Sequence, residues 1–312
     1  MMGLVLRRLA WALVVGWFVV TVTFAMVAMI PADPASALLG PHATPETLAR
    51  VRAHYCLDQG FLGQYGCWLA NLAHGDLGES YRSKRAVGAI MVERLWPTVQ
   101  LAVATIVLQL LLGIPLGVAA AVRRRRWPDR LASAIAFLGQ STPTFFLGTL
   151  LLYVFAYWFG WFPIGGYGSG FFDRLHHLVL PAMTLATVGV AYYSRLVRSE
   201  LIDTLGEDYV RTARAKGLRE RDVIVRHALP TALGPIVSLV GIDLGFLLGG
   251  AVVTEYIFAW PGLGREMLQA ILEVDIPLIL GVVLVAAITI ALANLLADLL
   301  HLKLDPRLGN GP

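Results

Sequence analysis

Residues 208–230 read DYVRTARAKGLRERDVIVRHALP and form a polar, basic island between two long apolar stretches. Asp208 is suited to cap a short helix, because its side-chain oxygen can accept a hydrogen bond from the first turn and its charge fits the positive helix end. Gly217 fits the left-handed turn that commonly ends such a helix. Tyr209 and Ala213 share one helical face with it. The pattern predicts two short helices around a glycine turn; the alternative is an ordinary cytoplasmic loop.

The composition is that of a membrane protein. Of the 312 residues, 57% are hydrophobic and 15% are charged, which is typical of chains that cross the bilayer several times. A span takes about 20 apolar residues, and six stretches are long enough. They are residues 9–30, 98–122, 131–160, 178–196, 232–258 and 277–300. The sequence therefore predicts an all-α polytopic membrane protein with six transmembrane helices. The third stretch is too long for one straight helix, so Pro143 is expected to kink it or to mark its cytoplasmic end.

Basic residues indicate the orientation. Lys and Arg concentrate in cytoplasmic segments, and most of the 25 in this chain fall on one side if both termini are cytoplasmic. The run from Arg123 to Arg126, directly after the second predicted span, is the firmest single marker. The net charge of +4 does not indicate a nucleic-acid partner, because the basic residues follow membrane edges. The first predicted span is longer than the apolar core of a signal peptide, so we expect it to be a transmembrane helix. A cleaved signal peptide is the alternative.

The chain divides into three predicted parts. Residues 1–95 hold the first span and an exported, periplasmic helical segment. Residues 96–303 form a five-helix core that contains the cytoplasmic loop 203–230, and residues 304–312 form a cytoplasmic tail.

The exported segment is expected to contain three helices, at residues 45–55, 61–73 and 86–95. Cys56 and Cys67, the only cysteines, lie on successive helices of this segment. An oxidising compartment permits a disulfide there, so the two are a disulfide candidate; two free buried thiols are the alternative.

Several catalytic and cofactor motifs are missing from the sequence. It has no GxxxxGK[ST] phosphate loop, no serine nucleophile elbow, no HExxH and no metal-spaced Cys/His cluster,. We therefore expect no catalytic residue, no cofactor and no metal site, and any ATP-driven work must come from a partner. The His176–His177 pair does not suggest a metal site, because adjacent residues on a helix point in different directions.

Two of the carboxylates inside predicted spans stand out, Asp243 near the middle of the fifth and Asp298 near the end of the sixth. An ionised group at mid-membrane costs at least about 2.5 kcal/mol and commonly faces a cavity or partner. Asp243 is therefore a candidate for lining a water-filled path across the membrane, and an internal hydrogen bond or a neutral acid is the alternative. The nearby glycines favour close helix packing, against a second subunit or within the chain. The path candidates are Asp243, Gly245 and Gly249.

The island at 208–230 resembles the coupling loop of ABC importer permeases. The family pattern is Glu-Ala-Ala, three residues, Gly, nine residues and Ile-x-Leu-Pro. The matching positions are Arg211-Thr212-Ala213, Gly217 and His227-Ala228-Leu229-Pro230. The Glu, one Ala and the Ile are replaced, but RTARAKGL followed by RHALP is typical of the peptide-permease branch.

Further sequence motifs of this family occur in the expected order along almost the whole chain. They are IPADP (30–34), LDQGFLGQYGCWL (57–69), GDLGESYRSKRAV (75–87), STPTFFLG (141–148), HHLVLPAMTLA (176–186), EYIFAWPGLGREM (255–267) and LDPR (304–307). The chain is thus similar to the B-type subunit of dipeptide and oligopeptide importers, a branch that also contains nickel and glutathione permeases.

The resemblance implies an ABC type I importer permease core in the bacterial cytoplasmic (inner) membrane. It implies a permease subunit that forms half of the translocation path of an ATP-driven importer for di- and oligopeptides. The implied partners are a second homologous permease subunit, two ATP-binding subunits, an extracytoplasmic substrate-binding protein and the lipid bilayer. The implied ATPase-coupling residues are Asp208, Tyr209, Arg211, Ala213, Arg214, Lys216, Gly217, Leu229 and Pro230.

Three alternatives remain at this point. The same architecture imports nickel chelates or glutathione in related systems. A stand-alone, ion-coupled secondary transporter is a second possibility, but it would need no coupling loop and commonly shows inverted repeats, which this sequence lacks. A membrane-embedded enzyme is the third, and the missing catalytic motifs argue against it.

Overall fold

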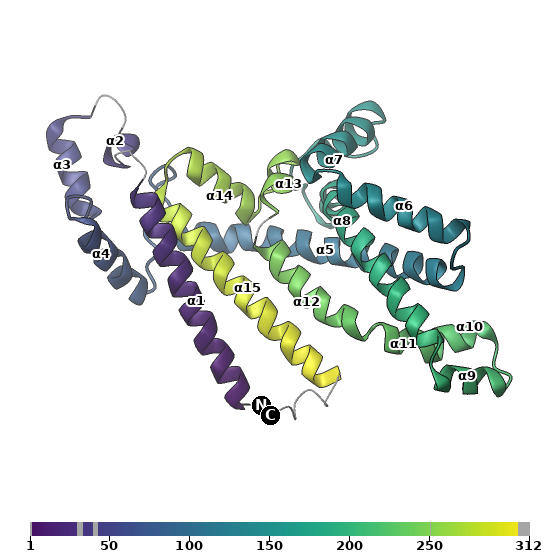
Figure 1. The fold of residues 1–312 in the computed structure, drawn as a ribbon. Helices are drawn as coiled ribbons and strands as arrows, with labels where there is room; N and C mark the ends of the chain where they lie inside the picture. Colours follow the sequence, from purple (N-terminus) through teal and green to yellow (C-terminus); the bar gives the residue numbers. More distant parts are fainter. Residues whose placement is uncertain (1, 30–33, 40–42, 250, 305–312) are drawn as a thin grey trace. The chain divides into compact units, whose positions relative to one another are not determined.

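The computed structural model describes the chain except for residues 1, 30–33, 40–42, 250 and 305–312 (Figure 1). The described residues are helical, with one isolated β-bridge between Glu79 and Ala86. They form two compact units, Met1–Thr98 with Pro261–Ala291, and Val99–Trp260 with Leu292–Pro312. This division differs from the predicted one in grouping residues 261–291 with the N-terminal part. The predicted tail 304–312 lies outside the described residues apart from Leu304.

The first unit contains five whole helices and the beginnings of two long ones. Two of the three helices predicted for the exported segment are present nearly as expected, and Thr44 caps the first of them through its side chain. The third, predicted at 86–95, is not separate: it is the start of α5, which continues through Pro97 without a break. The helices are α1 (Met2–Ala28), α2 (Pro34–Leu39), α3 (Pro45–His54), α4 (Phe61–Ala73), α5 (Val87–Val122), α14 (Leu263–Leu272) and α15 (Ile276–Leu304).

The core of the first unit explains why α5 starts so early. Apolar side chains on the first turns of α5 pack against α14 and α15, and their burial stabilises this part of the helix. Asp275 caps the start of α15 and is itself buried, accepting a hydrogen bond from the Ser80 hydroxyl at 2.6 Å. The buried core residues are Val27, Val87, Ile90, Met91, Leu263, Ala270, Leu278, Ile279 and Val282.

A disulfide joins Cys56, just after α3, to Cys67 on α4, with the two Cα atoms 6.7 Å apart. Crosslinks stabilise mainly by restricting the unfolded chain.

We expect the double substitution of Cys56 and Cys67 by serine to destabilise the exported segment by roughly 2–3 kcal/mol in the chain-entropy account of an 11-residue separation,. Protease resistance of the segment reports the loss. Intact-mass analysis of the alkylated, unreduced protein provides the control, because two alkylated thiols would show that no crosslink forms.

The second unit contains the remainder of α5 and α15 and the helices from α6 to α13. The third predicted span breaks where Pro143 was expected to kink it, between α6 and α7. The fifth also breaks, between α12 and α13. The helices are α6 (Trp127–Ser141), α7 (Thr144–Leu151), the π-helix η1 (Leu152–Trp158), α8 (Phe171–Leu205), α9 (Asp208–Ala215), α10 (Glu220–Asp222), the π-helix η2 (Val223–Ala228), α11 (Leu229–Ala232), α12 (Gly234–Leu248) and α13 (Val252–Ile257).

Glycines bring α5 and α8 together in the second unit. A Cβ on Gly113 would lie 2.9 Å from the Cβ of Tyr193, and one on Gly117 would lie 2.6 Å from the Cβ of Val197. Four-residue spacing of small residues allows this close crossing. Because later residues of α5 meet later residues of α8, the two helices run in the same direction. The second and fourth predicted spans would likewise run in one direction, inward, if both termini are cytoplasmic.

Membrane-spanning capacity differs among the described helices. Three are long and apolar enough to cross the bilayer alone, namely Val87–Val122, Phe171–Leu205 and Ile276–Leu296. A fourth span results if Glu220–Ala232 and Gly234–Leu248, bent by 47°, are taken together, and Leu13–Ala28 and Thr144–Trp158 are shorter apolar helices. The count of six spans stays a prediction.

Candidate functional site

The polar island folds as predicted into a helix, a turn and a second helical stretch beyond the end of α8 (Figure 1). The expected cap is wrong in one detail. α9 begins at Asp208, and the capping position is taken by Glu207 without a side-chain hydrogen bond. The Asp208 carboxylate is exposed and lies 3.3 Å from the Arg211 guanidinium one turn on. Its negative charge still lies in the first turn, where it favours the helix.

The inner face of α9 is buried against its own chain. Val210 and Ala213 are 0% and 5% exposed and lie in a cluster with Leu201 of α8 and Ala121 of α5. The sequence predicted that Tyr209 and Ala213 share one helical face, but in the structure Ala213 is buried and Tyr209 is exposed. Ala213 faces the core and is small enough to let α9 approach it, whereas the Tyr209 side chain is 43% exposed. Ala213 therefore positions α9 and is not part of its exposed surface.

Gly217 follows the end of α9 with φ +76°, the left-handed conformation expected for it. A Cβ at this position would meet no atom within 4 Å, so the backbone conformation and not space requires glycine. The Gly217 amide donates to the Arg214 carbonyl at 3.0 Å, which closes the turn.

The Arg214 side chain stabilises this turn through hydrogen bonds. Its guanidinium donates to both carboxylate oxygens of Glu220, at 2.8 and 3.1 Å, and to the Leu205 carbonyl at 3.3 Å. One side chain thus links the end of α8, α9 and the start of α10. The hydrogen bond from Arg214 lowers the pKa of the Glu220 carboxyl. The sequence did not identify Glu220, because a six-residue separation across a turn follows no helical pairing rule.

The outer face of the loop is basic with three exposed apolar side chains. Tyr209, Leu218 and Val225 are 43%, 41% and 52% exposed, and the Tyr209 hydroxyl donates to Thr231 Oγ1 at 3.1 Å. Leu229 is half-buried and Pro230 is exposed. We call this face the coupling surface; it comprises Tyr209, Arg211, Lys216, Leu218, Arg219, Arg221, Val225 and Arg226, all exposed.

Asp243 lies half-buried on α12 and interacts with the hydroxyl of Tyr193 on α8. That hydroxyl is buried without a hydrogen bond of normal geometry in the described structure, as are Gln109 Oε1 and Thr105 Oγ1 on α5. Gln109 lies against Gly189 of α8, where a Cβ would be 2.1 Å from Nε2. Polar groups from three helices therefore gather in the apolar interior of the second unit, which the sequence did not predict.

The remaining sequence candidates are two glycines, Asp298 and the histidine pair. Gly245 is buried and Gly249 is exposed, while the side chain of Asp298 lies outside those described. His176 Nε2 and His177 Nδ1 form hydrogen bonds to the carbonyls of Trp161 and Asp173, at 2.7 and 2.9 Å.

The fold and the basic coupling surface can now be compared with known proteins. Residues 113–310 match the family described as binding-protein-dependent transport system inner membrane component, and residues 1–102 match its N-terminal family. The chain belongs to this family. It is a multi-pass protein of the bacterial inner membrane and, as such a component, a permease subunit that is not itself catalytic.

Relatives extend over nearly the full length. A glutathione transport system permease protein GsiC of Escherichia coli O6:H1 is 38% identical, and the match covers 98% of each chain. A protein of Brucella abortus (strain 2308) that carries the name of a peptide transport system permease is 40% identical, with 98% of this chain and 99% of that one covered.

Solved structures share the permease fold with part of the chain. The inward-facing MetNI methionine ABC transporter matches with a TM-score of 0.56 at 20% identity, over 69% of this chain and 96% of that one. An amino acid ABC transporter matches with a TM-score of 0.53 at 16% identity, over 69% and 94%.

Proposed function

We propose that this inner membrane component is the permease subunit of an ATP-driven importer for short peptides, with glutathione, itself a tripeptide, within the same substrate class. The observation that carries the proposal is the full-length match to relatives named for glutathione and peptide transport. The importer would also contain a second permease subunit, two ATPase subunits and an extracytoplasmic binding protein.

The coupling surface is the proposed contact with the ATPase subunit. Its inner side is fixed by burial of Val210 and Ala213 and by the Arg214–Glu220 pair, so a force on α9 would reach the end of α8 without the loop deforming. The exposed Leu218 and Val225 offer apolar area, and the surrounding arginines favour an acidic partner surface. Rocking of packed helices would then alternate access across the membrane.

Uptake of a labelled dipeptide in cells with and without the gene tests the substrate class. We expect uptake to depend on the gene and excess unlabelled glutathione to compete for it. A control without the ATPase subunit should abolish uptake. Gene-dependent uptake that continues without any ATPase, or that carries nickel and no peptide, contradicts the proposal.

Asp243 is proposed to bias the translocation path toward amine-bearing solutes. Asp243→Asn keeps the size and hydrogen bonding of the side chain and removes its charge. We expect uptake of a cationic dipeptide such as Lys-Ala to fall about three- to tenfold relative to an anionic one, on the scale of one lost charge interaction.

Tyr193→Phe is the matched control, since it removes the hydroxyl partner of Asp243 and leaves the carboxyl in place. If uptake of cationic and anionic dipeptides falls equally in both variants, the pair only stabilises the helix interface. Asp243 would then not belong to the translocation path.

A further inference from the structure

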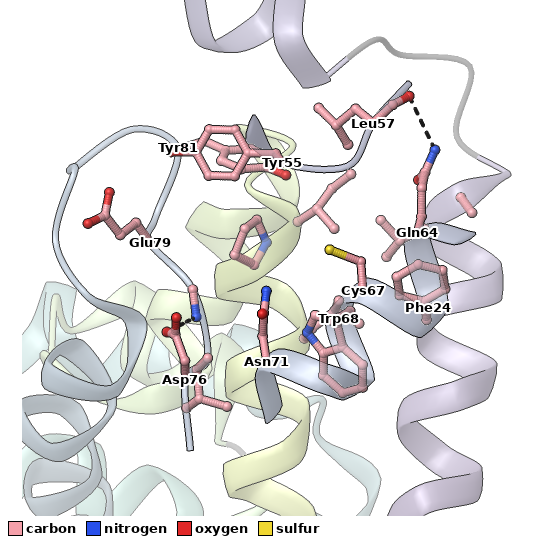
Figure 2. A pocket seen from close by; sticks show the side chains of 17 residues that line it. Phe24, Tyr55, Leu57, Gln64, Cys67, Trp68, Asn71, Asp76, Glu79 and Tyr81 are labelled. Carbon is pink, nitrogen blue, oxygen red and sulfur yellow. Dashed lines mark hydrogen bonds between the residues drawn. The ribbon is translucent and has the colours of Figure 1, made fainter. Parts of the chain in front are cut away.

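The first unit contains a cavity of about 120 Å³ that no step of the proposed transport uses (Figure 2). Its wall comes from α1, the end of α3, α4, the segment 76–81 and the start of α15. A dry cavity of about 150 Å³ holds benzene, so this one accommodates a group of side-chain size. The disulfide lies in its wall through Cys67 and fixes the segment after α3 to α4.

Aromatic rings form much of the cavity lining. Tyr55 and Tyr81 meet edge to face with ring centroids 5.1 Å apart, and Trp68 and Phe24 approach each other at 6.3 Å. In the view of Figure 2 the two tyrosines lie at one end of the cavity and Trp68 at the other. Aromatic faces attract organic cations within about 6 Å of the ring centroid.

One lining side chain is largely buried and carries a hydroxyl. Tyr81 is 8% exposed and lines the cavity, and no hydrogen bond joins its hydroxyl to another described side chain or backbone group. The hydroxyl oxygen is not among the fully buried atoms without a partner, so it can donate to or accept from a ligand or water.

Two exposed carboxylates belong to the cavity lining. Glu79 and Asp76 both line it, and Asp76 Oδ1 accepts a hydrogen bond from the Gly78 amide at 2.8 Å. Neither carboxylate is in an ion pair among the described residues. The neighbouring arginines have partners elsewhere: Arg82 pairs with Glu273, Arg85 with Glu93 and Arg94 with Glu266.

Nearby carboxylates affect the pKa of both tyrosines. Burial and then the carboxylates of Glu79 and Asp275 raise the pKa of the Tyr55 phenol. Burial and then Asp275 raise that of Tyr81. These carboxylates disfavour a further negative charge at the two phenols and favour a cation nearby,.

We propose that this cavity is a binding site for a primary alkylammonium group, with Glu79 and Asp76 as charge partners and the aromatic rings as walls. The site goes beyond the proposed function, because it lies on the exported segment and needs no ATPase. Two sources share this chemistry, the amino terminus of a short peptide and the side chain of a lysine.

The test uses the full chain in lipid nanodiscs and saturation-transfer NMR with n-butylammonium as the probe and n-butanol as its neutral counterpart. We expect the ammonium to bind about tenfold more tightly than the alcohol, the size of one charge-assisted hydrogen bond. Dialanine is titrated in a second arm. Preferred binding of dialanine assigns the site to peptide amino termini, and preferred binding of n-butylammonium assigns it to lysine-like chains. Equal affinity for ammonium and alcohol, or no binding by either amine, overturns the proposal.

Two variants assign the charge partner. Glu79→Gln is expected to weaken n-butylammonium binding about tenfold. Asp76→Asn keeps the acceptor for the Gly78 amide and removes the charge, so it gives the same comparison if Glu79→Gln folds poorly. Glu46→Gln is the matched control, since Glu46 is an exposed carboxylate of the same segment, paired with Arg50 and absent from the cavity wall. Unchanged binding in both cavity variants, or equal weakening in the control, refutes the site. Loss of binding with normal peptide uptake leaves the transport proposal intact.

Discussion

Replacement of Gly217 by proline is expected to abolish ATP-driven uptake while the chain still inserts in the membrane. Gly217 has φ +76°, and proline is locked near −65°, so the turn after α9 cannot form. The hydrogen bond from the Gly217 amide to the Arg214 carbonyl is lost as well. Because Arg214 also holds Glu220 and the end of α8, the whole coupling surface should lose its shape. Uptake should fall at least about a hundredfold, the scale of a strained backbone that costs about 3 kcal/mol.

Co-purification with the ATPase subunit separates coupling from translocation. Gly217→Ala should give an intermediate loss, since alanine tolerates the left-handed region at a cost of roughly 1 kcal/mol and a Cβ here meets open space. Gly206→Ala is the control for the backbone conformation, because Gly206 follows α8 with φ −82°, which any residue adopts; its added Cβ would lie 3.2 Å from the Asp203 carbonyl oxygen. If Gly217→Pro retains the ATPase and transports normally, α9 is not the coupling helix.

The sequence predicted the helical elements well where a local signal marks them. Gly217 and Pro143 act through their own backbone restrictions, and both breaks appear where expected. The helix expected at 86–95 is present but does not end there, because it continues as α5 to Val122. Its buried side chains Ile90 and Met91 pack against α14 and α15, which lie far away in sequence. No local pattern reports such a contact.

The candidate site was predicted in outline and not in its internal geometry. The positions of α9 and its turn followed from residues 208–217, but which face is buried depends on Leu201 and Ala121. Pairing of Arg214 with Glu220 likewise depends on the turn's path. Among the carboxylates in the predicted spans, the sequence singled out Asp243 and Asp298 and missed Glu255, which is 0% exposed.

Neutralising Asp129 is expected to loosen the packing of α6 on α8 and to reduce transport. Arg198 Nε and Nη2 donate to the two carboxylate oxygens of Asp129, at 2.6 and 2.9 Å, and the Asp129 side chain is 9% exposed against 31% for Arg198. The hydrogen bond from Arg198, followed by that from the Arg125 amide, lowers the pKa of Asp129 to about 2. Because Arg198 lies close to α9 along α8, a loose pair should also weaken coupling.

The direction of the pH dependence follows from this pKa. Asp129 is a stronger acid in the folded chain than in the unfolded one, so its ionised form contributes stability above about pH 4 and loses it as the pH falls toward 2,. The contribution at neutral pH is roughly 2 kcal/mol. Asp129→Asn should remove most of it at pH 7 and much less at pH 2, as measured by thermal unfolding of the purified chain in detergent.

Two further variants identify the pair as the cause. Asp203→Asn is the matched control, an exposed carboxylate on α8 with no ion pair among the described residues; it should change stability by less than about 0.5 kcal/mol. The exchanged pair Asp129→Arg with Arg198→Asp should recover part of the loss, since the charges again meet. Recovery should stay incomplete, because Asp129 Oδ2 also accepts the Arg125 amide at 2.9 Å, and arginine has no acceptor to replace it. Full stability in Asp129→Asn at pH 7 would show that apolar packing alone holds α6 on α8.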